Sequence, residues 1–122
     1  MIVTNYQNKS KIKNAHAIEA HKLHDSQHAI IMHLTLQAGE SLKPHITPVD
    51  VVFYVLEGKP TILIGDEEFV AQEDDLIESP KDIVHCIYNR TDKQARVLVN
   101  KLPRPQSATE IIGDKGNEKK NN

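Results

Sequence analysis

Residues 39–58 read GESLKPHITPVDVVFYVLEG, and this stretch decides the fold. Its second half, Val51 to Leu56, is a continuous apolar run that ends at Glu57-Gly58, which is typical of a buried β-strand. The segment before the stretch, Ala29 to Gln37, alternates apolar and polar residues with a period of two, which predicts a half-buried strand. The stretch therefore lies in a region of short β-strands.

Similar short segments continue as far as Pro105, and turn residues separate them. Gly65-Asp66 stands between two of these segments and predicts a tight hairpin. The pattern indicates an all-β protein, and the order of the strands suggests a jelly-roll barrel. Further strands are predicted at Ile18–Leu23, Thr61–Ile64, Glu67–Ala71, Leu76–Ser79, Ile83–Tyr88 and Ala95–Lys101.

The chain of 122 residues has no internal repeat and no central linker, so we expect one domain. Residues 18–105 form the predicted barrel and residues 1–17 an N-terminal extension. Residues 106–122 have almost nothing to bury and are expected to form a flexible C-terminal tail.

The composition excludes several classes of function. A net charge of −2 and 4% aromatic residues argue against nucleic acid as a partner. The longest apolar run is far below the ~20 residues that cross a bilayer, and the first ten residues lack the apolar core of a signal peptide, so we expect a cytoplasmic protein without membrane contact. The single cysteine, Cys86, fits a reducing compartment and is more typical of a buried small hydrophobe than of a nucleophile.

Two motifs resemble those of the cupin family. Residues 39–58 are similar to its first motif, with Gly39, His45 and Gly58 in register. Residues 74–89, DDLIESPKDIVHCIYN, are similar to its second motif through Pro80, His85 and Asn89. The resemblance covers about residues 18–105 and implies a double-stranded β-helix, or jelly-roll barrel.

The departures from the family pattern concern its metal ligands. Thr47 stands where the family has its second histidine, and Val51 stands where it has its glutamate. Asp74 and Asp82 replace the glycines of the second motif. Only two of the four ligands that the resemblance implies, His45 and His85, are therefore present.

The spacing of these residues predicts where they meet. Positions 45, 47 and 51 differ by even numbers, so their side chains point the same way in an extended chain, and a neighbouring strand brings His85 opposite them. His45 and His85 should therefore meet inside the barrel and face a ligand. The alternative is that they are core histidines with hydrogen bonds to each other, Thr47, Asn89 or water. They are the predicted ligands of a divalent metal (iron, manganese, nickel, zinc or copper), although the lack of a third donor predicts weak binding or none.

Two carboxylates are candidates for the missing donor or for a catalytic role. Asp50 is one residue from the glutamate position and reaches the site only if the chain bulges, and Glu78 lies in a segment otherwise suited to burial. The residues predicted to line the pocket are those that share parity or motif position with the histidines: Thr47, Val51, Phe53, Val55 and Asn89.

Five further histidines precede the best strand patterns. His21, His24 and His28 are spaced as a surface metal site on a helix would be, but a hairpin is the preferred prediction here, and it scatters them over solvent faces. His33 lies opposite the apolar face of its strand, so we expect it on the outer surface or in a subunit interface.

Two functions are consistent with these residues. One is a module that binds a small molecule, with or without a weak metal at His45 and His85. The other is a metal-assisted oxygenase, isomerase or lyase that acts on a small carbonyl or carboxylate compound. Ile31, Val52 and Tyr54 on outer faces predict a homodimer.

Overall fold

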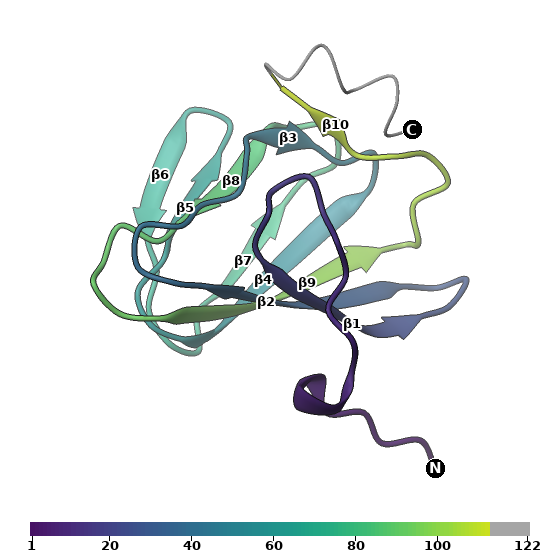
Figure 1. Ribbon diagram of the computed structural model, residues 1–122. Helices are drawn as coiled ribbons and strands as arrows, with labels where there is room; N and C mark the ends of the chain where they lie inside the picture. The colour runs from purple at the N-terminus through teal and green to yellow at the C-terminus, as the bar shows by residue number, and fades with distance from the viewer. Residues whose placement is uncertain (113–122) are drawn as a thin grey trace.

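The computed structural model describes residues 1–112 and consists almost entirely of β-strands, which confirms the predicted all-β jelly roll (Figure 1). A 3-10 turn precedes the first strand. The elements are η1 (Tyr6–Asn8), β1 (Glu19–Asp25), β2 (Ile30–Leu36), β3 (His45–Ile46), β4 (Asp50–Glu57), β5 (Thr61–Ile64), β6 (Glu67–Val70), β7 (Leu76–Ser79), β8 (His85–Tyr88), β9 (Ala95–Leu102) and β10 (Glu110–Ile111).

The strands form two antiparallel sheets of five strands each. The first sheet has the order β1-β2-β9-β4-β7, and the second has the order β10-β3-β8-β5-β6. The sheets face each other, and the alternating inward side chains of both form one hydrophobic core. Phe53, Leu36, Ile62 and Ile87 are among the largest fully buried side chains of this core.

The predicted strands are found with small shifts at their ends. Thr61–Ile64 and Leu76–Ser79 match β5 and β7, and Gly65-Asp66 makes the predicted hairpin between β5 and β6. The sequence prediction missed β3 and β10, which have only two residues each and so give no periodic signal.

Backbone conformation explains how the second motif tolerates its two aspartates. Asp74 and Asp82 have φ values of 73° and 65°, in the left-handed region where glycine is usual. Aspartate enters this region more readily than most residues. The motif therefore keeps the backbone shape that its glycines would give.

The C-terminal boundary lies later than predicted. Ile111 of β10 pairs with His45 of β3, so residues that were expected to begin a flexible tail at position 106 extend the second sheet. The rest of that predicted tail, residues 113–122, lies outside the described residues. Residues 1–112 contain no helix that is long and apolar enough to cross a membrane.

Candidate functional site

His45 and His85 lie against each other between the two sheets. β3 carries His45 and β8 carries His85, and the two residues are register partners. Their ring centroids are 4.4 Å apart, with an edge-to-face arrangement. Thr47 and Val51 are also buried, as the even spacing predicts. The predicted meeting of the two imidazoles inside the barrel is therefore confirmed.

Both ring nitrogens of His85 have hydroxyl partners. Nδ1 lies 2.8 Å from the Ser79 Oγ, and Nε2 lies 3.2 Å from the Thr47 Oγ1. A neutral imidazole has one N–H and one lone pair, so one hydroxyl accepts from the ring and the other donates to it. Burial, and then the neighbouring His45, lower the pKa of His85 to about 3. His85 is therefore a neutral ring with both nitrogens in use.

The two ring nitrogens of His45 differ in their hydrogen bonding. Its Nδ1 lies 2.7 Å from the backbone carbonyl of Lys43, and because a carbonyl only accepts, Nδ1 donates. Burial lowers the pKa of His45 although this hydrogen bond opposes the shift. The neutral ring then has its lone pair on Nε2. His45 consequently offers a hydrogen-bond acceptor to a ligand.

A third histidine, His16, lies next to His45. It lies on the loop that precedes β1 and rises toward β3 in Figure 1, and its ring centroid is 4.8 Å from that of His45. The Nδ1 of His16 accepts the backbone N–H of Lys43 at 2.8 Å, so the neutral ring has its proton on Nε2. Burial, and then His45, lower the pKa of His16 to about 4.

Asn14 fixes the loop that carries His16. The Oδ1 of Asn14 accepts the backbone N–H of His16 at 3.1 Å, and its Nδ2 donates to the carbonyls of Ile12 and Ile18 at 3.0 and 2.9 Å. His16 was not predicted as a site residue because its loop has no strand periodicity. The only signal was its membership of a histidine-rich N-terminal region.

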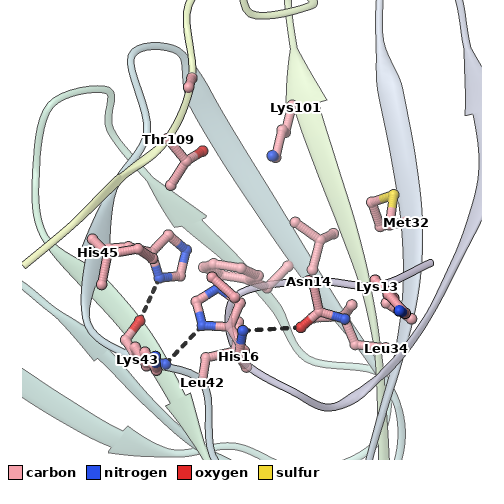
Figure 2. A pocket seen from close by; sticks show the side chains of 16 residues that line it. Lys13, Asn14, His16, Met32, Leu34, Leu42, Lys43, His45, Lys101 and Thr109 are labelled. Atoms are coloured by element: carbon pink, nitrogen blue, oxygen red, sulfur yellow. Dashed lines mark hydrogen bonds between the residues drawn. The ribbon is translucent and has the colours of Figure 1, made fainter. Parts of the chain in front are cut away.

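A cavity of about 680 Å³ opens in front of His16 and His45 (Figure 2). This volume is typical of a small-molecule site. Its wall is mostly apolar, with a few polar and basic groups. The lining residues are Lys13, Asn14, Ala15, His16, Ala20, Met32, Leu34, Leu42, Lys43, His45, Phe53, Val99, Lys101, Ala108, Thr109 and Ile111.

Lys101 is the second site residue that the sequence analysis missed. The inward positions of β9, Ala95, Val97 and Val99, are buried, and Lys101 continues the same parity at the end of the strand. Its side chain projects into the cavity (Figure 2). Burial lowers the pKa of the Lys101 ammonium. Extending the period of two by one step would have identified this residue.

The five residues predicted to line the pocket separate into three groups. Phe53 lines the cavity. Thr47, Val51 and Val55 are buried but do not line it, and the Thr47 Oγ1 lies 3.4 Å from the hydroxyl of the lining residue Thr109.

Asn89 is not part of the cavity lining either. Its side-chain amide donates to the carbonyls of Leu36, Gln37 and Lys93, at 3.0, 3.2 and 2.7 Å. These bonds tie together two loops, so Asn89 stabilises the fold instead of facing a ligand.

The two candidate carboxylates do not reach the site. Asp50 is exposed, and its Oδ1 accepts the backbone N–H of Lys81 at 2.9 Å. Glu78 is exposed because it alternates with the buried Ser79, which takes the inward position on β7. Strand parity thus turns both carboxylates outward, which corrects the expectation that one of them replaces the missing glutamate.

The donor set does not fit a tightly held metal ion. Such a site needs at least three protein donors with free lone pairs, and both nitrogens of His85 already have hydroxyl partners. In the part of the chain that the structure describes, no three His, Cys, Asp or Glu side chains are grouped so that they could hold a metal. Coordination by His85 would require the loss of a hydrogen bond to Ser79 or Thr47.

The outer face of the first sheet carries histidines whose surroundings differ from the prediction. His33 lies on the outer face but is buried, because Tyr6 of η1 stacks on it with ring centroids 3.8 Å apart. His21, expected on a solvent face, is buried as well and contacts the Lys9 carbonyl through Nδ1 at 2.9 Å. The N-terminal segment thus folds back over this face.

His24 and His28 are exposed, as predicted. Cys86 is buried, and its Sγ lies 3.1 Å from the Leu42 carbonyl. Burial raises the pKa of the Cys86 thiol, which fits a small core residue and not a nucleophile.

Two antiparallel sheets around a histidine-lined cavity define a double-stranded β-helix protein. The cupin domain family matches residues 32–100, which is more than half of the chain. The chain therefore belongs to the cupin family. No curated protein matches its sequence.

Solved structures with the same fold include three that differ in origin. TT1209 from Thermus thermophilus is 24% identical with a TM-score of 0.75, and the match covers 86% of this chain and 100% of that one. An RmlC-like cupin family protein from Methanocaldococcus jannaschii is 22% identical with a TM-score of 0.71, over 87% and 95% of the two chains. The polyketide cyclase RemF from Streptomyces resistomycificus is 16% identical with a TM-score of 0.75, over 92% and 85%. At these identities the likeness shows the fold alone.

Proposed function

We propose that this cupin binds a small organic molecule in the cavity between its sheets, with His45 in direct contact with the ligand. The observation that carries the proposal is an oriented imidazole, with Nδ1 bonded to the Lys43 carbonyl and Nε2 free, at the wall of a cavity of about 680 Å³. A mostly apolar wall with a few fixed polar groups is the usual form of a ligand site.

His85, Thr47 and Ser79 support His45 from behind. The edge-to-face contact of His85 with His45 and its own two hydroxyl contacts hold the pair of rings in one arrangement. A polar group that is fixed before binding loses little conformational entropy when the ligand arrives. In this proposal His85 positions His45 and does not itself touch the ligand.

The experiment is a thermal-shift screen of chelator-treated protein against a broad panel of small metabolites. A compound at a hundredfold excess over its dissociation constant should add about 2.7 kcal/mol to the free energy of unfolding. The variant Met32→Trp places an indole in the cavity lining and should abolish the shift. Leu76→Trp, at an exposed position of β7, is the matched control and should keep it.

Two results would contradict the proposal. One is a panel without any stabilising compound, and the other is a shift that survives Met32→Trp unchanged. Repeating the screen with added iron, manganese, nickel, zinc or copper tests the prediction of a weak metal at His45 and His85. The prediction would be supported by a thermal shift that requires the metal and is lost in both His45→Ala and His85→Ala. Such a result would show that the donor geometry described above does not prevent metal binding.

A metal-assisted oxygenase, isomerase or lyase remains the alternative, and one observation supports an enzymatic role. His45 is neutral and oriented, with a free lone pair beside the cavity, which suits a general base. The fold is shared with a polyketide cyclase, but this fold hosts many unrelated activities. Incubating each stabilising compound with the protein and analysing for products separates the two functions: turnover that is lost in His45→Ala supports the enzyme.

A further inference from the structure

The charged residues that line the cavity are all basic in the described part of the chain. Lys13, Lys43 and Lys101 belong to the lining, and no aspartate or glutamate of residues 1–112 does. The whole chain has 17 acidic and 15 basic residues, so its overall charge does not explain why the charged lining residues are basic. The positive character is a local property of the cavity.

Lys101 is the basic residue that lies deepest in this arrangement. It is half-buried, whereas Lys13 and Lys43 are exposed at the rim. Within residues 1–112, no carboxylate lies within ion-pair distance of the Lys101 Nζ. Elsewhere on the first sheet, basic residues have partners: Lys22 pairs with Asp25 at 3.0 Å and Arg96 pairs with Glu57 at 2.7 Å.

A half-buried ammonium without a counter-ion is unfavourable, since it loses hydration and gains no opposite charge. Its positive charge is also felt throughout the site, because Lys101 lowers the pKa of His16, His45 and His85. No carboxylate of residues 1–112 contributes to the pKa shift of any of these three histidines. A negative ligand group would relieve this imbalance.

We propose that the ligand is a small monocarboxylate with an apolar body, and that its carboxylate pairs with Lys101. The inference rests on the proposed binding function and specifies the class of ligand. The carboxylate lies on the β9 side of the cavity, and the apolar body lies against Met32, Leu34 and Phe53.

The wall favours a carboxylate over a phosphate. Phosphate sites are built from several converging N–H groups or from a fork of arginine donors, and none of the arginines within residues 1–112 lines this cavity. Lys101 is the half-buried lysine of the lining, and its ammonium acts as a point charge that matches one negative charge. Most of the remaining wall is apolar and suits a hydrocarbon body.

His45 sets the orientation of the ligand. A carboxylate oxygen would be repelled by the lone pair on the Nε2 of neutral His45, so the carboxylate is directed away from this ring and toward Lys101. Any hydroxyl or amine group of the ligand can donate to the same lone pair. The proton on the Nε2 of His16 offers a complementary donor beside it.

The test uses octanoate and 3-phenylpropionate, each compared with its uncharged primary amide, in calorimetric titrations of the full chain. Each carboxylate should bind at least tenfold more tightly than its amide. Lys101→Met removes the charge but keeps the approximate length of the side chain, and it should erase this preference. Lys13→Met, at the exposed rim, is the matched control and should keep most of the preference.

The outcomes separate the inference from the proposed function. Equal binding of acid and amide, or a preference that survives Lys101→Met, would overturn the inference while the cavity remained a binding site. The inference would also be overturned if neutral compounds of the broad panel bind and no carboxylate does. If no compound of either kind binds, both the inference and the proposed function fail.

Discussion

The buried imidazole of His85 predicts a specific loss of stability in acid. Its folded-state pKa is about 3, against the ordinary value of 6.5, and burial is the main cause. Between these two values the unfolded chain binds a proton at this position and the folded chain does not, so stability falls as the pH falls. The stabilising contribution is fully present above about pH 6.5 and is lost progressively toward pH 3.

The size of the effect follows from the two pKa values. Lowering the pH from about 7.5 to about 4.5 should cost about 2–3 kcal/mol through His85 alone. His85 is 2% exposed, so solvent screens this effect little.

The assay is urea unfolding of the wild type and of His85→Gln at both pH values. Glutamine keeps a donor near the position of Nε2 but does not titrate, so the variant should lose about 2–3 kcal/mol less than the wild type between the two pH values. The lowered pKa values of His16 and His33 act in both proteins and largely cancel in the comparison. An identical pH dependence in the two proteins would refute the reasoning.

Three further predictions concern stability and assembly. Lys101→Met should stabilise the ligand-free protein by about 1 kcal/mol in urea unfolding, because it removes a half-buried charge without a counter-ion; a loss of stability would show that the ammonium is well solvated. Asp82→Gly should raise the free energy of unfolding by roughly 0.5–1 kcal/mol and Asp82→Val should lower it, because φ at this position is 65°; the opposite order would contradict the left-handed conformation. The homodimer stays a prediction that rests on the half-buried outer residues Ile31, Val52 and Tyr54, and light scattering that shows only monomer at working concentration would count against it.

The fold and the centre of the site were predictable because both depend on periodicity. Alternation along Ala29–Gln37 and the apolar run at Val51–Leu56 marked two central strands, and the even spacing of the motif positions placed His45 opposite His85. These signals are local, and the structure preserves them. The same alternation along β9 and β7 places Lys101 on the inner side and Glu78 on the outer side.

The parts that could not be predicted depend on long-range contacts. His16 reaches the cavity only because its loop binds the backbone of Lys43, and no local pattern encodes a contact across 27 positions. His33 follows its strand parity to the outer face, yet it is buried by Tyr6 from the N-terminal segment. The contact of His85 with Ser79 was not predicted for the same reason, because the two residues come from different strands. With Thr47 at the other nitrogen, a metal bound to His85 would have to displace one of the two hydroxyls.

The central claim is that a small ligand contacts the free nitrogen of His45 in the cavity. Long-range ¹⁵N–¹H spectra of the histidine rings, recorded during titration with a stabilising compound, test it most directly. We predict that the free protein shows a neutral His45 protonated on Nδ1, and that the ligand shifts its Nε2 resonance while exposed His24 stays unchanged. A ligand that binds without moving any resonance of His45, or that moves only those of the outer-face histidines, would contradict the account.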